Sequence, residues 1–234
     1  MRSLIPSSVE NGFKGALEPL ARWLGKRNAN PNWLTTLGFL LSIFCAWEIA
    51  SGQLVTGGFL VFISGLFDTI DGAVARKTGR VTRFGAVYDS TMDRYSEVTV
   101  FFGLGFYLIG NHYYLTSVAA VFAVGGSIMV SYIRARAETL GFKANVGLAR
   151  RQERVVILGL GLVLNVFDPF FDRAFYGSVY QMSGTVFVHP PFALAVSVLL
   201  LAVLTNLTAI QRLFYVYKQF KSEEPRPQPG KEDQ

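Results

Sequence analysis

The sequence predicts an all-α integral membrane protein with six transmembrane helices. Three observations carry this prediction: hydrophobic residues make up 51% of the chain, charged residues make up only 16%, and the apolar residues gather in long runs. A soluble chain usually carries about 25% charged residues. Inside a bilayer, backbone amides can be satisfied only within helices or closed barrels, so the runs indicate helices.

Residues 1–30 mix apolar positions, such as Phe13, Leu17 and Trp23, with basic ones at near-helical spacing. This amphipathic pattern predicts a helix that lies on the membrane surface. Pro31 then separates this helix from the first transmembrane span. At the other end, residues 219–234 are polar and rich in proline, so we expect a disordered tail.

Six apolar segments form a predicted transmembrane domain over residues 31–218. They are residues 33–50, 54–67, 88–109, 113–133, 155–171 and 191–217. A bilayer core requires about 20 residues of helix. The second and third segments reach that length only if each includes the carboxylates at its end.

Basic residues gather on one face of this predicted bundle. All but two of the 22 Lys and Arg residues lie in the N-terminal arm, in the second-to-third and fourth-to-fifth joints, or at the C-terminal end; the exceptions are Arg94 and Arg173. Because cytoplasmic joints carry an excess of basic residues, we expect a multi-pass protein of the cell membrane with both termini in the cytoplasm. We expect the lipid bilayer, and no nucleic acid, as a partner.

Four carboxylates flank the second-to-third joint, at Asp68, Asp71, Asp89 and Asp93. Helical residues three or four apart share a face, so the two members of each pair point the same way. The short basic joint favours antiparallel neighbouring helices, whose carboxylates then face each other near the cytoplasmic end. Such charges repel strongly in a low dielectric and need a cation. Oxygen ligands favour Mg²⁺ or Mn²⁺, with room for one or two ions.

An ion pair, a transporter or a scaffold could also account for these carboxylates. An ion pair with a nearby Arg is the simpler interpretation of any one Asp, though not of the spaced set. An ion-coupled transporter predicts carboxylates near the bilayer midplane and internal repeats, whereas these cluster at one end and no repeat is visible. A non-catalytic scaffold would not need this spacing. The single cysteine, Cys45, excludes an intramolecular disulfide framework and a cysteine-based zinc site.

The run from Asp68 to Asp93 reads D-x2-D-G-x2-A-R-x8-G-x3-D-x3-D. It resembles the signature of the CDP-alcohol phosphotransferase family at every fixed position, and the six-span layout agrees. The resemblance implies transfer of a phosphatidyl-type group from a CDP-linked lipid to an alcohol, with release of CMP, on the cytoplasmic side of the membrane. It also implies a homodimer.

The resemblance implies a role for each matching residue. Asp68, Asp71 and Asp89 would bind two divalent ions on the CDP pyrophosphate, and Asp93 would complete the metal site and act as the general base. The positions that resemble nucleotide contacts are Pro31, Asn32, Thr35, Gly72, Arg76 and Thr82. Attack on a phosphodiester needs charge neutralisation and a stabilised leaving group, and two metal ions supply both.

Residues within and beyond the run indicate the acceptor alcohol. The stretch Asp89-Ser-Thr-Met-Asp93-Arg94 resembles members of the family that accept inositol phosphate. Four further residues near the cytoplasmic ends of three spans would make a pocket for a dianionic phosphate. They are Ser131, Arg134, Arg154 and Arg212. The alternative is that these are ordinary residues of the cytoplasmic face.

The resemblance therefore implies CDP-diacylglycerol and inositol phosphate as substrates and a phosphatidylinositol phosphate as product. A glycerol phosphate acceptor, as in phosphatidylglycerophosphate synthases, is the alternative within the family, and CDP-archaeol is an alternative lipid donor. The roles of Arg94 and Glu97 stay open, because they can either support the metal ligands or contact a second copy.

Overall fold

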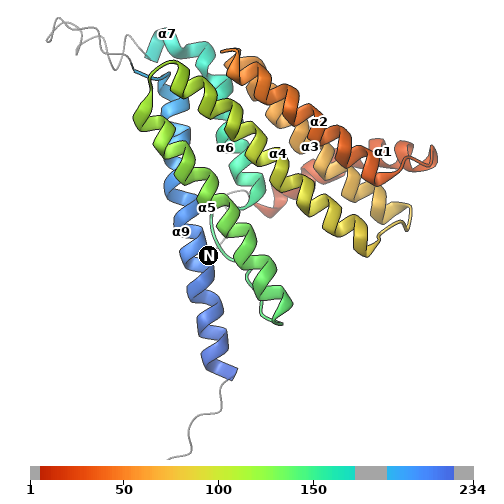
Figure 1. Cartoon of the computed structure of the whole chain (residues 1–234). Coiled ribbons are helices and arrows are strands. Elements are labelled where there is room, and N and C mark those ends of the chain that lie inside the picture. The colour runs from red at the N-terminus through yellow and green to blue at the C-terminus, as the bar shows by residue number, and fades with distance from the viewer. Residues whose placement is uncertain (1–5, 172–188, 224–234) are drawn as a thin grey trace, which may run out of the picture.

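The computed structural model describes residues 6–171 and 189–223. The described residues fold into helices joined by short connections, with no strand among them (Figure 1). In chain order the elements are α1 (Ser7–Lys26), α2 (Pro31–Ala50), α3 (Leu54–Lys77), α4 (Arg83–Gly110), α5 (Tyr114–Thr139), α6 (Arg151–Val163), the 3₁₀ helix η1 (Leu164–Phe167), α7 (Asp168–Phe171) and α9 (Phe192–Glu223).

Five helical stretches in this part of the chain are long and apolar enough to cross a membrane: α2, α3, α5, the continuous stretch Arg151–Phe171 and α9. The chain is therefore a multi-pass membrane protein, and the predicted all-helical fold is confirmed. The third predicted span corresponds to α4, which is 28 residues long. Residues 83–97 of this helix include Asp89, Asp93, Arg94 and Glu97, so composition alone does not single it out as a span.

The packing order of the helices differs from the sequence prediction in one respect. α2 packs along both α3 and α4, which approach each other at only a few positions. Small residues allow this, because a Cβ at Gly103 of α4 would collide with the backbone of Ala46 in α2. On the other side of the bundle α5 pairs with α9, and α6 connects α3 to α9 (Figure 1).

The hydrophobic core lies in the half of the bundle away from the carboxylates. Its fully buried members include Ile49, Leu104, Leu108, Leu162 and Leu194. Helices in a bilayer associate through close packing rather than through the hydrophobic effect. This packing leaves the opposite end of the bundle free for polar side chains.

The first helix is tied to the bundle by a second apolar cluster of Ala21, Leu34, Ile70 and Val74. An ion pair of 2.6 Å between Lys77 Nζ and Glu18 Oε1 adds to this attachment. The exposed apolar side chains of α1 are Val9, Phe13, Leu20 and Trp23. α1 is thus a helix within the predicted residues 1–30, with apolar side chains both packed on the bundle and exposed.

The last helix continues past the predicted start of the tail at residue 219, because α9 runs to Glu223. Gln219 stabilises this final turn: its Nε2 donates to Lys143 O at 2.6 Å, and its Oε1 accepts from Lys143 N at 3.1 Å. The predicted boundary is thus too early. Residues 224–234 of the predicted tail lie outside the described residues.

Candidate active site

Three of the four predicted metal ligands come together where α3 and α4 meet. One carboxylate oxygen from each of Asp68, Asp89 and Asp93 lies within 4.8 Å of the others. Asp93 is buried, and the other two are half-buried. Carboxylate oxygens at this spacing are the donor set that Mg²⁺ and Mn²⁺ prefer. The chemistry of these residues therefore fits a divalent metal ion.

The fourth predicted ligand, Asp71, is buried with 3% of its surface exposed. Its Oδ2 accepts a hydrogen bond of 2.6 Å from Thr35 Oγ1, which also lies 3.1 Å from the carbonyl oxygen of Pro31. Thr35 was predicted to lie near the nucleotide, and the structure places it against a predicted metal ligand. This contact fixes the first turn of α2 beside the acidic cluster.

The other predicted nucleotide positions lie at helix ends around the cluster. Thr82 caps α4 by accepting from the N–H of Gly85 at 2.9 Å. A Cβ at Gly85 would lie 3.4 Å from Asn32 Oδ1, so the first turns of α2 and α4 are adjacent. Helix N-termini favour anions. At the end of α3, a Cβ at Gly72 would lie 3.3 Å from Arg76 Nη1, so the guanidinium folds back over the position next to Asp71.

A cavity of about 680 Å³ opens beside the acidic cluster. All four residues predicted to bind the acceptor phosphate line this cavity, and these four come from α5, α6 and α9. They are Ser131, Arg134, Arg154 and Arg212. Asp89 and Asp93 of α4 line the cavity as well. The cavity therefore brings the carboxylates of Asp89 and Asp93 close to several guanidinium groups, and Glu138 adds a third carboxylate to its lining.

Two of these arginines are held rigidly by the protein. Arg154 donates from Nε and Nη2 to the two carboxylate oxygens of Glu97 at 2.7 and 2.9 Å, and from Nη1 to Ala149 O at 3.0 Å. Arg212 donates from Nε to Val146 O at 2.9 Å and from Nη1 to Val130 O at 2.6 Å. A guanidinium has five N–H donors, so both arginines keep donors for a ligand.

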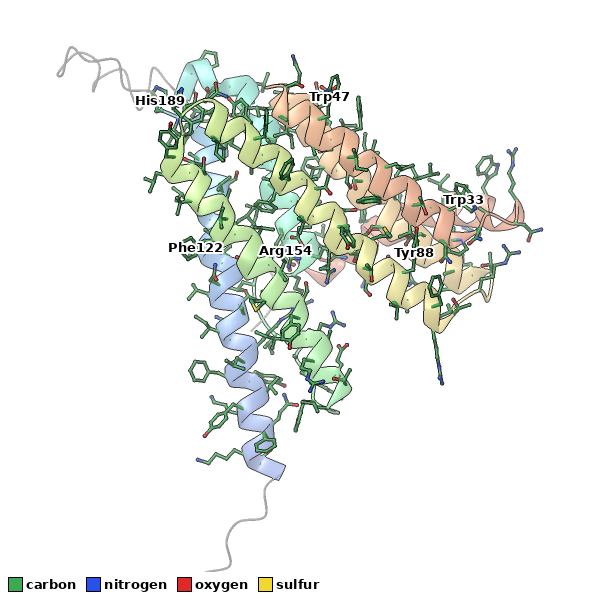
Figure 2. All side chains as sticks on the ribbon, in the orientation of Figure 1. Trp33, Trp47, Tyr88, Phe122, Arg154 and His189 are labelled. Carbon is green, nitrogen blue, oxygen red and sulfur yellow. The ribbon has the colours of Figure 1, made fainter. Side chains whose placement is uncertain are left out.

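Arg134 is held differently from these two. Its Nε donates to Glu138 Oε1 at 2.8 Å, and both side chains are about half exposed. This pair lies at the open side of the cavity. Figure 2 shows Arg154, in contrast, inside the bundle.

Sequence reasoning missed the role of Arg151 in this site and left the role of Glu97 open. Arg151 forms ion pairs with both Asp68 and Asp93, although the sequence counted it only among the basic residues of a joint. Glu97, whose role stayed open, is the largely buried partner of Arg154 and also accepts from Ser127 at 2.5 Å. Glu97 lies one helical turn after Asp93, and this spacing was the available signal. Arg94 pairs with its neighbour Asp93 at 3.2 Å.

The chain resembles several known proteins over most of its length. Residues 28–165 match the CDP-alcohol phosphatidyltransferase family. The archaetidylinositol phosphate synthase of Methanothermobacter thermautotrophicus is 34% identical over 218 residues, which cover 93% of this chain and 98% of that protein. The phosphatidylinositol phosphate synthase of Mycobacterium bovis is 33% identical over 236 residues, 99% of each chain.

Solved structures of a phosphatidylinositol phosphate synthase also resemble this chain. The Mycobacterium tuberculosis phosphatidylinositol phosphate synthase with CDP-DAG bound is 35% identical, with a TM-score of 0.68 over 86% of this chain and 92% of that one. The same synthase in complex with manganese and citrate has a TM-score of 0.70 over 92% of this chain and 95% of that one. With its acidic run, its helical membrane fold and these matches, the chain belongs to the CDP-alcohol phosphatidyltransferase family of transferases.

Proposed function

We propose that this protein is a phosphatidylinositol-phosphate synthase, which transfers a phosphatidyl group from CDP-diacylglycerol to a hydroxyl of inositol phosphate and releases CMP. The relatives that cover almost the whole chain are phosphatidylinositol and archaetidylinositol phosphate synthases. One observation carries the choice of acceptor. A single cavity joins Asp89 and Asp93 to the guanidinium groups of Arg134, Arg154 and Arg212.

The arginines suit an acceptor that carries a phosphate of its own. Guanidinium groups bind phosphate through paired, charge-assisted hydrogen bonds. A phosphate held by Arg134, Arg154, Arg212 and Ser131 would place the inositol ring between that wall and the acidic cluster. Positioning of this kind contributes much of the rate in reactions between two bound substrates.

The reaction itself needs few protein groups. An inositol hydroxyl attacks the phosphorus attached to the diacylglycerol, a new P–O bond forms, and the P–O bond to CMP breaks. Asp93, which lines the cavity, would take the proton of that hydroxyl. Asn32, Thr35, Gly72, Arg76 and Thr82, together with Pro31 at the start of α2, would hold the nucleotide.

Asp68, Asp71, Asp89 and Asp93 would hold the metal, for which we propose two Mg²⁺ or Mn²⁺ ions. When bound, these ions would neutralise the pyrophosphate and stabilise the leaving CMP. Asp71 keeps one carboxylate oxygen beyond the one that Thr35 contacts. A relative was solved in complex with manganese and citrate, which supports a divalent ion as the cofactor proposed for the acidic cluster.

We also propose that α4 is a sixth transmembrane span and that the site faces the cytoplasm. α4 packs between α2 and α5 and runs alongside α2 (Figure 1). The basic joints Arg76–Arg83 and Arg134–Arg154 lie at the same end as the carboxylates, which agrees with a cytoplasmic end. α1 would lie on that membrane surface. Large apolar side chains exposed on α4, such as Phe102 and Phe106, would face lipid or the second copy of a homodimer.

A comparison of acceptors tests the proposed function. Purified protein in detergent with CDP-diacylglycerol and Mg²⁺ is expected to release CMP with inositol phosphate, and to do so poorly with inositol, because inositol lacks the phosphate that the arginines bind. Turnover with glycerol 3-phosphate and none with inositol phosphate would show that the acceptor assignment is wrong. CMP is measured by chromatography.

The lipid donor has a second candidate, since one relative at 34% identity is an archaetidylinositol phosphate synthase. CDP-archaeol differs from CDP-diacylglycerol in its ether-linked chains and not in the CDP group that the site would bind. Rates with the two lipids at equal concentration decide between them. The acceptor and the metal ligands are the same in either case.

Removal of divalent ions is expected to abolish CMP release. The three carboxylates within 4.8 Å of one another cannot neutralise a pyrophosphate without a cation. Treatment with EDTA should stop the reaction, Mg²⁺ or Mn²⁺ should restore it, and calorimetric titration should give two Mn²⁺ per chain in the presence of a CDP-lipid. Activity that survives complete chelation would contradict the metal-dependent mechanism.

A further inference from the structure

The connection between α5 and α6, residues 140–150, builds part of the cavity wall without forming a helix or a strand. Asn145 and Arg150 line the cavity, and Ala144 and Ala149 are fully buried. A buried segment of this kind must find hydrogen-bond partners for its backbone elsewhere. Most of the side-chain partners that the structure shows come from α9.

Thr208 of α9 is the central partner, and it is fully buried with 1% of its surface exposed. Its Oγ1 accepts hydrogen bonds from the N–H groups of Leu148 at 3.3 Å and Ala149 at 3.1 Å. One helical turn further on, Arg212 Nε donates to Val146 O at 2.9 Å. Residues 208 and 212 share a helix face, so this face of α9 holds residues 146–149.

The backbone of residues 146–149 needs a glycine at position 147 to make these contacts. Gly147 has a φ of +115°, and a Cβ there would collide with the Cγ2 atom of Thr208. Residues with a side chain rarely adopt this φ. Glycine at position 147 therefore allows the close approach of the segment to Thr208.

Ala149 connects Thr208 to the cavity. Its N–H donates to Thr208 Oγ1 at 3.1 Å, and its carbonyl oxygen accepts from Arg154 Nη1 at 3.0 Å. A shift of this residue would therefore move Arg154 and the adjacent Arg150, both of which line the cavity. Thr208 itself does not line it.

We propose that Thr208 is a positioning residue for the acceptor phosphate: through residues 146–149 it sets where Asn145, Arg150 and Arg154 meet the acceptor. This inference rests on the proposed function, because it takes the arginine wall as the acceptor's side of the site. The acidic cluster and the nucleotide positions lie on α2, α3 and α4, whereas the hydrogen bonds that the structure shows for Thr208 go to residues 148 and 149. Loss of its hydroxyl should thus affect the acceptor and spare the CDP-lipid.

The test compares Thr208→Val with Thr208→Ser in the full chain. Valine keeps the shape but cannot accept the two hydrogen bonds, so the KM for inositol phosphate should rise about tenfold while the KM for CDP-diacylglycerol stays the same. Serine restores the acceptor oxygen and should restore the KM. An unchanged KM for inositol phosphate, or an equal rise in both KM values, would overturn the proposal.

Thr205→Val is the matched control. Thr205 lies one turn earlier and is equally buried, and its hydroxyl donates within the helix to Leu201 O at 2.8 Å, with Ala123 O at 3.2 Å as the alternative acceptor. Both kinetic constants should stay near wild type in this variant. A rise in the KM for inositol phosphate as large as in Thr208→Val would show a general effect of altering α9, and would also overturn the proposal.

Amide hydrogen exchange separates a failure of this inference from a failure of the proposed function. In the wild-type protein the amides of Leu148 and Ala149 should be protected, and Thr208→Val should accelerate their exchange. Unprotected amides in the wild-type protein would overturn the inference even if the Val variant did not fold. If the wild-type protein does not use inositol phosphate, the proposed function fails, whereas the exchange result still decides whether Thr208 holds the segment.

Discussion

Asp93→Asn is expected to reduce CMP release by about 10²–10⁴-fold or more, because it removes the proposed general base. It also removes an oxygen from the proposed metal site, so the loss should lie at the upper end of that range. Asn has almost the same shape as Asp. Asp93 is buried against Arg94 and Arg151, and removing one of three crowded carboxylates should leave the fold intact.

Glu48→Gln provides the control for Asp93→Asn. It makes the same carboxylate-to-amide change near the other end of α2, far from the cluster along the bundle. Its CMP release should equal that of the wild-type protein. Thermal unfolding in detergent should confirm that both variants fold. A folded Asp93→Asn protein with near wild-type activity would show that Asp93 is neither the base nor an essential ligand.

Arg154→Gln is expected to destabilise the protein by about 3–5 kcal/mol, because it leaves the Glu97 carboxylate buried without its partner. Both side chains are largely buried, at 4% and 13% exposure. The paired hydrogen bonds at 2.7 and 2.9 Å hold α6 to α4. The same change should raise the KM for inositol phosphate, since Arg154 lines the cavity.

A double-mutant cycle measures the coupling between Arg154 and Glu97. Glu97→Gln combined with Arg154→Gln should cost much less than the sum of the single changes, because no unpaired charge stays buried. Arg134→Gln gives the comparison for stability. Its partner Glu138 is one turn away and about half exposed, so this change should cost only about 0.3–0.5 kcal/mol. Additive costs at Glu97 and Arg154 would contradict a coupled buried pair.

Much of the architecture was visible in the sequence because each feature is local. The apolar run 33–50 became α2 (Pro31–Ala50), and the amphipathic pattern of residues 1–30 became α1. The spacing of Asp68, Asp89 and Asp93 anticipated a cluster, and the structure brings these three carboxylates together. The arginines expected around the acceptor line one cavity with Asp89 and Asp93.

The remaining features depend on contacts between residues far apart in the chain. Sequence spacing favoured α3 beside α4, but the glycines of the bundle let α2 pack against both. Arg154 and Glu97 are 57 residues apart in sequence, and Arg151 and Asp68 are 83 apart. No local pattern shows which basic residue of a joint will reach which carboxylate. Asp71 was expected among the metal ligands, and its contact with Thr35 arises only once α2 and α3 are packed.

The lipid formed from CDP-diacylglycerol and inositol phosphate tests the central claim most directly. Mass spectrometry of the reaction, with Mg²⁺ and purified protein, should show a phosphatidylinositol phosphate formed in equal amount to CMP. This result would place the acceptor phosphate and the CDP-lipid in one site, as the cavity between the carboxylates and the arginines indicates. Phosphatidic acid as the lipid product, or no CMP above the protein-free reaction, would contradict the account.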